Sequence, residues 1–379
     1  MSEMSYLEKL LDGTEVEWKA LGDVTSVLRG KRLTKNLLSA EEKFPVFHGG
    51  LEPLGYYNKS NRPANTVMII NVGASAGTVG YSTVDFWSSD GCFCLEHNEL
   101  LNNRFLYFAL IGYQSLLKSK VRVAGIPTLD AIVVNKLLIP IPCPDNPEKS
   151  LAIQAEIVRI LDKFTALTAK LTAELTMRKK QYNYYRDKLL SFEEGGVEWK
   201  TLGEIVKMRA GQHISARNIV DGKEGDFVYP CFGGNGIRGY VKEKSHDGEH
   251  LLIGRQGALC GNVQRMKGQF YATEHAVVVS AMQGIDIDWA FHMLTTMNLN
   301  QYASKSAQPG LAVGKLQELK LLVPSIERQK YIAKILDKFD TLTSSITEGL
   351  PREIELRQKQ YEYYRDLLFS FPKPETASN

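Results

Sequence analysis

Apolar residues recur with helical spacing in two long stretches of this sequence. In the first stretch, Ile153, Ile157, Ile160 and Phe164 follow one another in steps of four, three and four residues. The pattern continues almost to residue 190, with one additional step of four residues. Spacing of this kind, with one stutter, is typical of a coiled-coil seam. It predicts a helix over residues 151–191 that packs against another helix.

The second stretch, residues 325–371, repeats this spacing and is four residues longer, which is about one helical turn. It also contains Gly349 and Pro351. An interior proline removes a backbone donor and costs about 3 kcal/mol, so we expect a kink or a break near these two residues. Ser150 and Ser325 precede the two stretches, and we predict that each caps the helix that follows.

Two strings within these stretches occur twice. Residues 160–164 are identical to residues 335–339, an offset of 175. Residues 181–187 return at residues 360–366 with one difference, an offset of 179. Repeats of this length indicate that the chain is an internal duplication, so fold and function are to be derived from the repeat unit.

The regions outside the long helices also match each other. Residues 16–149 and 192–324 contain short β-branched and aromatic runs separated by glycines, with a helix predicted over residues 103–117. At an offset of 184 they share glycines and large apolar residues, such as Phe105 and Trp289, whereas the polar residues between them differ. This predicts two domains with one fold and different surfaces.

The expected fold class is α+β: two repeated mixed α/β domains separated by a long antiparallel two-helix coiled coil, with pseudo-twofold symmetry. The N-terminal residues resemble the last turns of the first long helix, so the repeat is cyclic. We expect them to dock where the second long helix ends. A tail rich in proline and small polar residues is expected to be disordered. The predicted parts, in chain order, are residues 1–15, 16–149, 150–191, 192–324, 325–371 and 372–379.

Composition narrows the function only slightly. The formal net charge of +3 neither requires nor excludes nucleic acid. The five cysteines include no C-x-x-C pair, which is typical of a reducing cytoplasm and predicts no structural metal. No apolar run approaches the roughly 18 residues of a membrane span, and no signal peptide is recognisable. We therefore expect a cytoplasmic protein.

The glycine-rich strings predict turns and not a nucleotide site. Residues 72–80 lack the Gly-Lys-Ser/Thr string of a phosphate-binding loop, and the repeat copy keeps only the glycines. The glycines after Phe47 and Phe232 are likewise predicted to form turns. His275 aligns with Gly91 of the other copy, which favours a hydrogen-bonded structural role. No catalytic set occurs in both copies, so we predict no catalytic residue, no cofactor and no metal.

Basic and amide side chains occur at matched positions early in each domain. Lys and Arg neutralise phosphates, and Arg, Gln and Asn pair with base edges. Solvated loop charge explains any single residue equally well, but the two matched loops together favour DNA. The candidate DNA-binding residues are Arg29, Lys31, Arg32, Lys35, Lys118, Lys120 and Arg122 in the first domain, and Arg209, Gln212, His213, Arg217, Arg238, Lys242, Arg255, Gln256 and Lys305 in the second.

The long helices carry tyrosines on the seam and basic residues on the outer face. We predict that Tyr182, Tyr185, Tyr361 and Tyr364 are interhelix core and not stacking platforms for bases. The outer face could contact a partner protein or the DNA backbone. Its candidate partner-binding residues are Arg178, Lys179, Lys180, Arg357 and Lys359.

The chain resembles the specificity (S) subunits of type I restriction–modification systems. The resemblance covers nearly the whole chain and lies in the two repeated helix strings, each preceded by a glutamine (Gln154 and Gln329), and in the glycine string after Tyr229. The first domain departs from that glycine pattern at His48 and Leu51.

The resemblance implies a non-catalytic chain with two target-recognition domains, each reading half of a bipartite site in double-stranded DNA. The helices would space the domains and dock two methyltransferase (M) subunits, and restriction/translocase (R) subunits would join that core. S-adenosylmethionine, ATP and Mg²⁺ would belong to the partners. Two alternatives remain at this point: a non-DNA scaffold with two protein-binding domains on a coiled coil, and an enzyme that uses the glycine loop.

Overall fold

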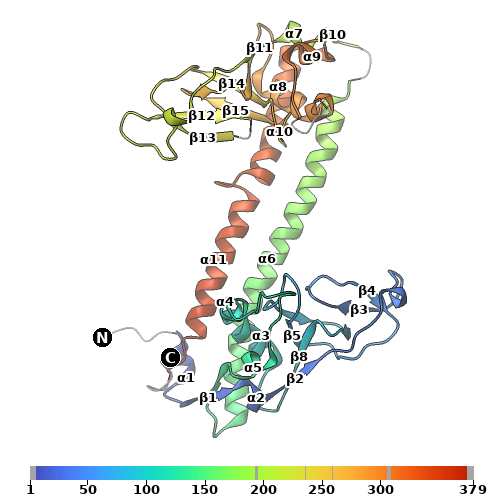
Figure 1. Cartoon of the computed structure of the whole chain (residues 1–379), viewed down its shortest axis with the longest axis vertical. Helices are drawn as coiled ribbons and strands as arrows, with labels where there is room; N and C mark the ends of the chain where they lie inside the picture. The colour runs from blue at the N-terminus through green and yellow to red at the C-terminus, as the bar shows by residue number, and fades with distance from the viewer. Residues whose placement is uncertain (1–5, 193–194, 235, 258, 305–308, 374–379) are drawn as a thin grey trace. The chain divides into compact units, whose positions relative to one another are not determined.

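The structure is a computed structural model that describes residues 6–192, 195–234, 236–257, 259–304 and 309–373 (Figure 1). The chain forms two compact units. Met1–Leu171 and Ile354–Asn379 belong to the first, and Thr172–Glu353 belong to the second. Most of the tail predicted to be disordered lies outside the described residues. None of the helices in the described part of the chain is long and apolar enough to cross a membrane.

The first domain contains a four-stranded sheet, a three-stranded sheet and a strand pair. Helix α3, Asn103–Gly112, packs on β5 (Thr66–Ile70) and β6 (Val79–Ser82) of the larger sheet and buries Phe105 and Phe108 completely. The larger sheet has the order β2 (Thr25–Arg29), β8 (Cys92–His97), β5 (Thr66–Ile70) and β6 (Val79–Ser82). The smaller has the order β4 (Gly55–Tyr57), β3 (Phe44–Phe47) and β7 (Trp87–Ser88), and β1 (Val16–Ala20) pairs with β9 (Leu138–Pro142).

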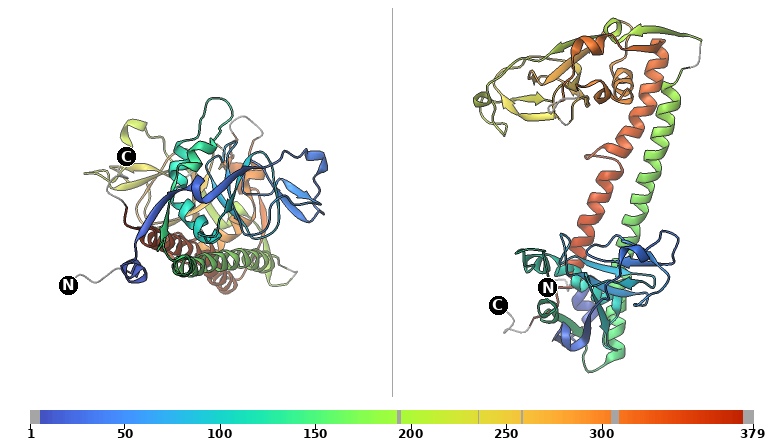
Figure 2. Two further views of the ribbon diagram at one scale, coloured as in Figure 1. Left: turned by 90° about the horizontal axis from the view of Figure 1, so that it is seen from below. Right: turned by 45° about the vertical axis from the view of Figure 1, so that its right-hand side comes forward.

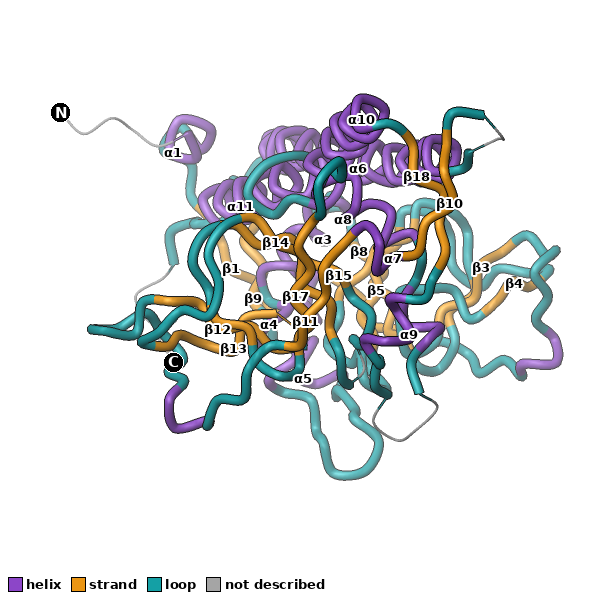
Figure 3. Tube along the Cα trace, turned by 90° about the horizontal axis from the view of Figure 1, so that it is seen from above, coloured by secondary structure: helices purple, strands orange, loops and turns teal. Residues whose placement is uncertain are grey.

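The second domain repeats this topology (Figure 3). Helix α8, Ile287–Thr296, packs on β14 (Glu249–Gly254) and β15 (Val263–Lys267) and buries Trp289, the counterpart of Phe105. The sheet orders are β11 (Val206–Ala210), β17 (Ala276–Ala281), β14 (Glu249–Gly254), β15 (Val263–Lys267), and β13 (Gly236–Val241), β12 (Tyr229–Gly233), β16 (Tyr271–Ala272). The strand pair is β10 (Val197–Thr201) with β18 (Lys320–Pro324). The prediction of one fold built twice is confirmed.

Short helices complete each domain. The helix predicted over residues 103–117 is in fact two helices, because α3 ends at Gly112 and α4 begins after Tyr113. The remaining short helices are α1 (Tyr6–Leu11), α2 (Leu21–Val24), η1 (Lys35–Leu37), α4 (Gln114–Ser119) and α5 (Ala131–Asn135), then α7 (Leu202–Ile205), η2 (Ala216–Asn218), η3 (Leu299–Tyr302) and α9 (Val313–Gln317).

The glycine-rich strings are hairpin turns. Residues 71–78 join β5 to β6, and the Gly77 N–H donates to the Ile70 carbonyl at 2.8 Å. A Cβ at Gly77 would lie 2.8 Å from the backbone nitrogen of Lys118, and one at Gly261 would lie 2.4 Å from that of Asn300. Both glycines also have positive φ. These positions need glycine for backbone geometry and close packing, which is the structural role that the sequence indicated.

The first long helix starts earlier than predicted. Helix α6 runs over Pro147–Leu190, 44 residues, and is shared by the two units. The prediction that Ser150 caps it is wrong, because Asn146 Oδ1 accepts the Lys149 N–H at 3.0 Å and Ser150 is buried inside the first turns. Proline at the first helical position is favourable, since its missing N–H has no helical partner there. Ser325 does cap its helix, as predicted.

The second long stretch is two helices, α10 (Ile326–Ser344) and α11 (Leu350–Leu368), each of 19 residues (Figure 2). The interruption falls at residues 345–349, beside Gly349 and Pro351, where the sequence led us to expect a kink or a break. The four extra residues therefore do not form an additional helical turn. Gly349 has φ +84°, and a Cβ there would lie 2.3 Å from the Thr341 carbonyl oxygen. Pro351 falls in the first turn of α11, where proline is tolerated.

The seam tyrosines pack on the aromatic residue of the other repeated string. Tyr364 stacks on Phe164 with centroids 5.2 Å apart, and Tyr185 stacks on Phe339 at 5.7 Å. Tyr182 and Tyr361 are half-buried, whereas Tyr185 and Tyr364 keep one exposed face. The interhelix role is therefore correct, but these side chains form only a partly buried seam.

The two chain ends meet in the first unit. Trp18 Nε1 donates to the Pro372 carbonyl at 2.7 Å, and Leu7 of α1 belongs to the same buried cluster as Leu368 and Phe371. The N-terminal helix thus packs with the end of α11, which agrees with the expected cyclic repeat.

A repeated glutamine attaches each domain to its long helix. Gln154 Oε1 accepts the Asn102 N–H at 2.8 Å, and Gln154 Nε2 donates to the Leu100 carbonyl at 2.8 Å. Gln329 accepts the Asp286 N–H at 2.9 Å in the same way. Both glutamines are buried. The shared string therefore contains a side chain that holds the loop leading into the domain helix.

The repeated aspartate finds a different partner in each domain. Asp162 accepts from Arg104 Nε at 2.8 Å, and Arg104 belongs to α3. Asp337 accepts instead from Arg265 of β15 and lies 2.8 Å from Nε2 of the fully buried His292. The repeated aspartate therefore pairs with an arginine in both domains. That arginine belongs to a helix in the first domain and to a strand in the second.

Candidate nucleic-acid interface

An exposed loop follows the first sheet strand of each domain and carries the predicted basic residues. It begins at Gly30 in the first domain and at Gly211 in the second. A Cβ at Gly30 would lie 2.2 Å from the Ser89 carbonyl oxygen, and one at Gly211 would lie 2.3 Å from that of Thr273. Only glycine lets the chain pass this closely. Each loop then forms one short 3-10 turn, η1 or η2.

An aromatic side chain fixes each of these loops. Trp87 Nε1 donates to the Lys31 carbonyl at 2.8 Å, and the Tyr271 hydroxyl donates to the His213 carbonyl at 3.3 Å. Trp87 packs edge-on against Tyr57, with centroids 5.3 Å apart. Two chemically different donors therefore hold the same part of the backbone in place.

Further loops meet the first one at the same edge of the domain. In the first domain the Asn71 N–H donates to the Gly91 carbonyl at 3.0 Å, and the Gly73 N–H donates to the Pro127 carbonyl at 2.9 Å. The second domain makes the same two bonds: Arg255 N–H to His275 O at 2.8 Å and Gly257 N–H to Pro309 O at 3.1 Å. The hairpin turn, the turn before β8 or β17, and the loop after α4 or η3 are thereby brought together.

We call this surface the loop edge of each domain. In the first domain it comprises residues 29–39, 48–50, 71–77, 89–91 and 118–128. In the second it comprises residues 209–220, 233–234, 236, 255–257, 259–261, 273–275, 300–304 and 309–310.

A chain of polar side chains crosses the loop edge of the second domain. His213 Nδ1 lies 3.0 Å from Glu274 Oε1, which lies 3.5 Å from His275 Nε2, and His275 Nδ1 lies 2.6 Å from Gln256 Oε1. Burial opposes ionisation of Glu274, but the bond from His213 and the nearby His275 bring its pKa below the ordinary value. His275 is hydrogen-bonded, as predicted, and it lies on the candidate interface.

The first domain has different residues at the position that corresponds to this polar chain. Asp90 takes the position of Glu274, and its carboxylate lies 3.3 Å from His48 Nδ1. Arg29 Nε donates to the Asp90 carbonyl at 3.0 Å. A Cβ at Gly91 would lie 2.8 Å from His48 Nδ1, so His48 fills the space of the missing side chain. The departure at His48 from the glycine pattern therefore supplies the imidazole that lies beside this carboxylate.

The structure gathers most of the predicted residues at these two edges. Lys31, Arg32 and Lys35 lie exposed in the early loop of the first domain, and Lys118, Lys120 and Arg122 lie exposed on the neighbouring loop. In the second domain Arg209, Gln212, His213, Arg217 and Gln256 are likewise exposed. Lys305 lies outside the described residues.

The three remaining candidates of the second domain also have contacts within the domain. Arg255 is half-buried and donates through Nε to the Leu311 carbonyl at 3.3 Å. The stem of Arg238 fills the space beside Gly233. Lys242 Nζ lies 3.3 Å from a carboxylate oxygen of Asp226.

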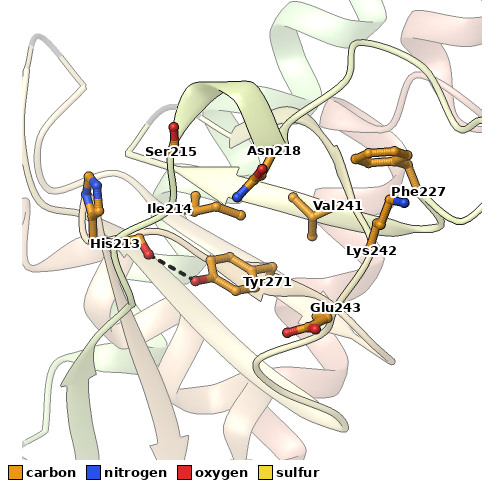
Figure 4. A pocket seen from close by; sticks show the side chains of 9 residues that line it. All are labelled: His213, Ile214, Ser215, Asn218, Phe227, Val241, Lys242, Glu243 and Tyr271. Atoms are coloured by element: carbon orange, nitrogen blue, oxygen red, sulfur yellow. Dashed lines mark hydrogen bonds between the residues drawn. The ribbon is translucent and has the colours of Figure 1, made fainter.

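An open pocket of about 420 Å³ adjoins the early loop of the second domain (Figure 4). The rings of Tyr271 and Phe227 line it together with the side chains of Val241, Lys242 and Glu243. Sequence reasoning did not find this pocket, nor the tethers Trp87 and Tyr271. The repeat offset of 184 aligns the two aromatic residues and would have drawn attention to them.

Three basic side chains on the outer face of the long helices pair with acceptors on their own helix. Arg178 lies 3.4 Å from Glu174, Arg357 donates to Gln360 at 2.7 Å and Lys359 to Glu355 at 2.6 Å. Lys179 and Lys180 are exposed.

The same helices expose one tyrosine per repeat that sequence reasoning did not single out. Tyr184 is 60% exposed and Tyr363 is 65% exposed. Each packs edge-on against the next tyrosine with centroids 5.3 Å apart.

Two copies of one domain with matched loop edges define a repeated recognition protein, and comparison with known proteins gives its family. The family model described as the type I restriction modification DNA specificity domain matches residues 14–177 and 194–356. The chain belongs to this family. The resemblance found in the sequence, and with it the expected role as a specificity subunit, is confirmed.

Curated relatives agree with this assignment, and a solved structure shares the fold. The chain is 60% identical over 375 residues to the type I restriction enzyme EcoprrI specificity subunit of Escherichia coli, covering 92% of this chain and 93% of that protein. It is 42% identical over 413 residues to the EcoR124I/EcoR124II specificity subunit, covering 100% of each. The crystal structure of the S subunit from M. genitalium has the same fold, with a TM-score of 0.70 at 20% identity, covering 98% of this chain and 100% of that one.

Proposed function

We propose that each domain of this chain reads one half of a bipartite target in double-stranded DNA, with the loop edge as the reading surface. The observation that carries the proposal is that the loop edge is built twice on the same backbone hydrogen bonds with different side chains. A constant backbone frame places side chains at fixed positions, and different side chains read different bases. The exposed Lys and Arg residues would contact phosphates.

Two double substitutions test this proposal. Replacing Arg32 and Lys35 with Ala should weaken binding to the first half-site, and replacing Arg209 and Arg217 with Ala should do so for the second. Each lost phosphate contact should lower the slope of log K against log salt by roughly one. Replacing Lys9 and Lys149 with Ala, away from the loop edge, is the control. An unchanged affinity and slope for both double variants would remove these loops from the DNA surface.

We further propose that the long helices dock two methyltransferase subunits, which restriction/translocase subunits join, in the cytoplasm. Two identical partners require two identical surfaces, and the repeated helix strings are the most similar parts of the chain. Exposed tyrosines are frequent interface anchors. Tyr184 and Tyr363 lie at equivalent positions of the two strings, and each follows a lysine of the basic outer face, Lys180 or Lys359, by four residues.

The stoichiometry of the complex tests the docking proposal. Tyr184→Ala or Tyr363→Ala alone should weaken one of two docking sites, so native mass spectrometry should show a species with one methyltransferase subunit. The double variant should lose both. Tyr56→Ala, at an exposed tyrosine of the first domain, serves as the control. Full occupancy in the double variant would contradict a role for these tyrosines.

A further inference from the structure

The loop edge of the first domain includes a hairpin with an apolar tip. Arg122 and Thr128 exchange both backbone hydrogen bonds, at 2.9 and 3.0 Å, which closes the base of the hairpin. Gly125 turns the chain with φ +84°. Val123 and Ile126, one on each arm, are 80% and 71% exposed. The closed hairpin thus fixes the backbone that carries two solvent-exposed aliphatic side chains.

The surroundings of this tip are basic. Lys118 and Lys120 lie exposed on the segment that leads into the hairpin, and Arg122 forms its base. Arg122 also lies 3.1 Å from Asp130, and both side chains of this pair are exposed. Single exposed aliphatic residues need no explanation. Here two exposed aliphatic side chains lie together on a closed hairpin of the loop edge, and cationic side chains flank them. This arrangement is complementary to a surface that is apolar at its centre and anionic on both sides.

We propose that Val123 and Ile126 enter the major groove of the target and contact the 5-methyl groups of thymine. This inference rests on the proposed function. The thymine methyl is the one apolar group that base pairs display in that groove, which is about 12 Å wide and flanked by phosphates. Valine and isoleucine have no polar atom in their side chains, so they distinguish thymine from cytosine by contact with the methyl group alone.

The second domain reads by other chemistry. In the second domain the Ser304 N–H donates to the Gly310 carbonyl at 2.9 Å, and the sequence between these two residues is Lys-Ser-Ala-Gln-Pro. That sequence contains no valine or isoleucine. The two halves of the target should therefore differ in their dependence on thymine methyl groups.

Substitution of thymine by uracil in the target tests the proposal, because uracil lacks only the methyl group. The chain is assembled with its methyltransferase subunits, and the target is taken from the methylation pattern of cells that express the complete system. Fluorescence anisotropy then measures the affinity for duplexes in which each thymine of the first half-site is replaced in turn. Loss of one buried methyl should weaken wild-type binding by about fourfold at one or two positions.

Val123→Ser with Ile126→Ser should bind the thymine duplex about tenfold more weakly and make no distinction between thymine and uracil. Val84→Ser, at an exposed valine two residues after the end of β6, should keep the discrimination of the wild type. Equal melting temperatures would show that the variants are folded.

Equal affinity of the wild type for thymine and uracil duplexes at every position would overturn the proposal, as would full discrimination by the serine variant. Loss of methyltransferase assembly in the serine variant would also overturn it and would make the tip a protein contact. A wild-type complex that binds no bipartite duplex would instead refute the proposed function.

Discussion

At the scale of single residues, Asp162 and Asp337 show how one side chain of a repeated helix accommodates two different domains. Position 108 of the first domain is Phe, and its counterpart in the second domain is His292. Both side chains are fully buried. The histidine brings an ionisable group into a core that the first domain leaves apolar at this point.

We predict that the second unit loses stability at acid pH through His292. Burial lowers the pKa of this imidazole, an effect that the bond to Asp337 only partly opposes. Below its ordinary pKa of about 6.5 the unfolded chain binds a proton that the folded unit does not, so stability is full above that pH and falls as the pH drops toward the folded pKa. The slope reaches at most about 1.4 kcal/mol per pH unit.

Hydrogen exchange of α8, measured between pH 7 and pH 5, checks this prediction. His292→Phe, which copies the first domain, should show a flatter dependence than the wild type after correction for intrinsic exchange. The charged groups around the imidazole are Asp337, Arg265 and Asp340. Parallel curves would show that His292 does not determine the acid response.

Residue chemistry could be predicted only in part. The repeats identified Gln154 and Gln329 as shared, and the matched loops identified Arg32 and His213. The roles of Trp87 and Tyr271 could not be foreseen, because indole N–H and phenol O–H bond to a backbone carbonyl that lies far away in sequence. Only the folded chain brings these groups together.

At the scale of elements, the interruption between α10 and α11 depends on Gly349. We predict that Gly349→Ala lowers the free energy of unfolding by more than about 1 kcal/mol, because the new Cβ meets the Thr341 carbonyl and the positive φ disfavours alanine. Urea denaturation measures the change. Gly314→Ala, at an exposed glycine of α9 whose Cβ would meet nothing within 4 Å, should change stability by less than about 0.5 kcal/mol. Similar effects at both sites would contradict the argument.

Periodicity predicted the long helices but not their ends. The seam of α6 was visible because its apolar residues keep one spacing over many turns. Its start was misplaced because Asn146 and Ser150 are both acceptable caps, and Pro147 fits the first turn after Asn146. In the second stretch, the spacing alone could not show whether four extra residues form a turn of helix or a loop. The positive φ of Gly349 interrupts the helix, so the extra residues form a loop.

At the scale of the whole molecule, α6 runs without interruption from one unit into the other. We predict that its length sets the gap between the two half-sites. Four residues inserted after Leu171, matched by four in the segment between α10 and α11, add about 6 Å of helix and about 40° of rotation. At 3.4 Å per base pair this corresponds to one or two base pairs.

The methylation pattern of cells that express the lengthened chain with its partner subunits measures this effect. The two half-sites should remain unchanged while the gap grows by one or two base pairs. Circular dichroism of the purified variant verifies that the helix is intact. A folded variant with the original gap would show that the partner subunits or bending of the DNA set the spacing.

The meeting of the two chain ends in the first unit has a consequence for synthesis on the ribosome. Phe369 and Phe371 pack on Phe105 with ring centroids 5.0 and 6.3 Å apart, and Tyr361 packs on Phe108. The second unit is contiguous in the chain, so all its residues have been made before these last aromatic residues emerge. The half that is translated first is therefore completed last, and until then its nascent chain keeps uncovered the apolar surface that α11 will bury.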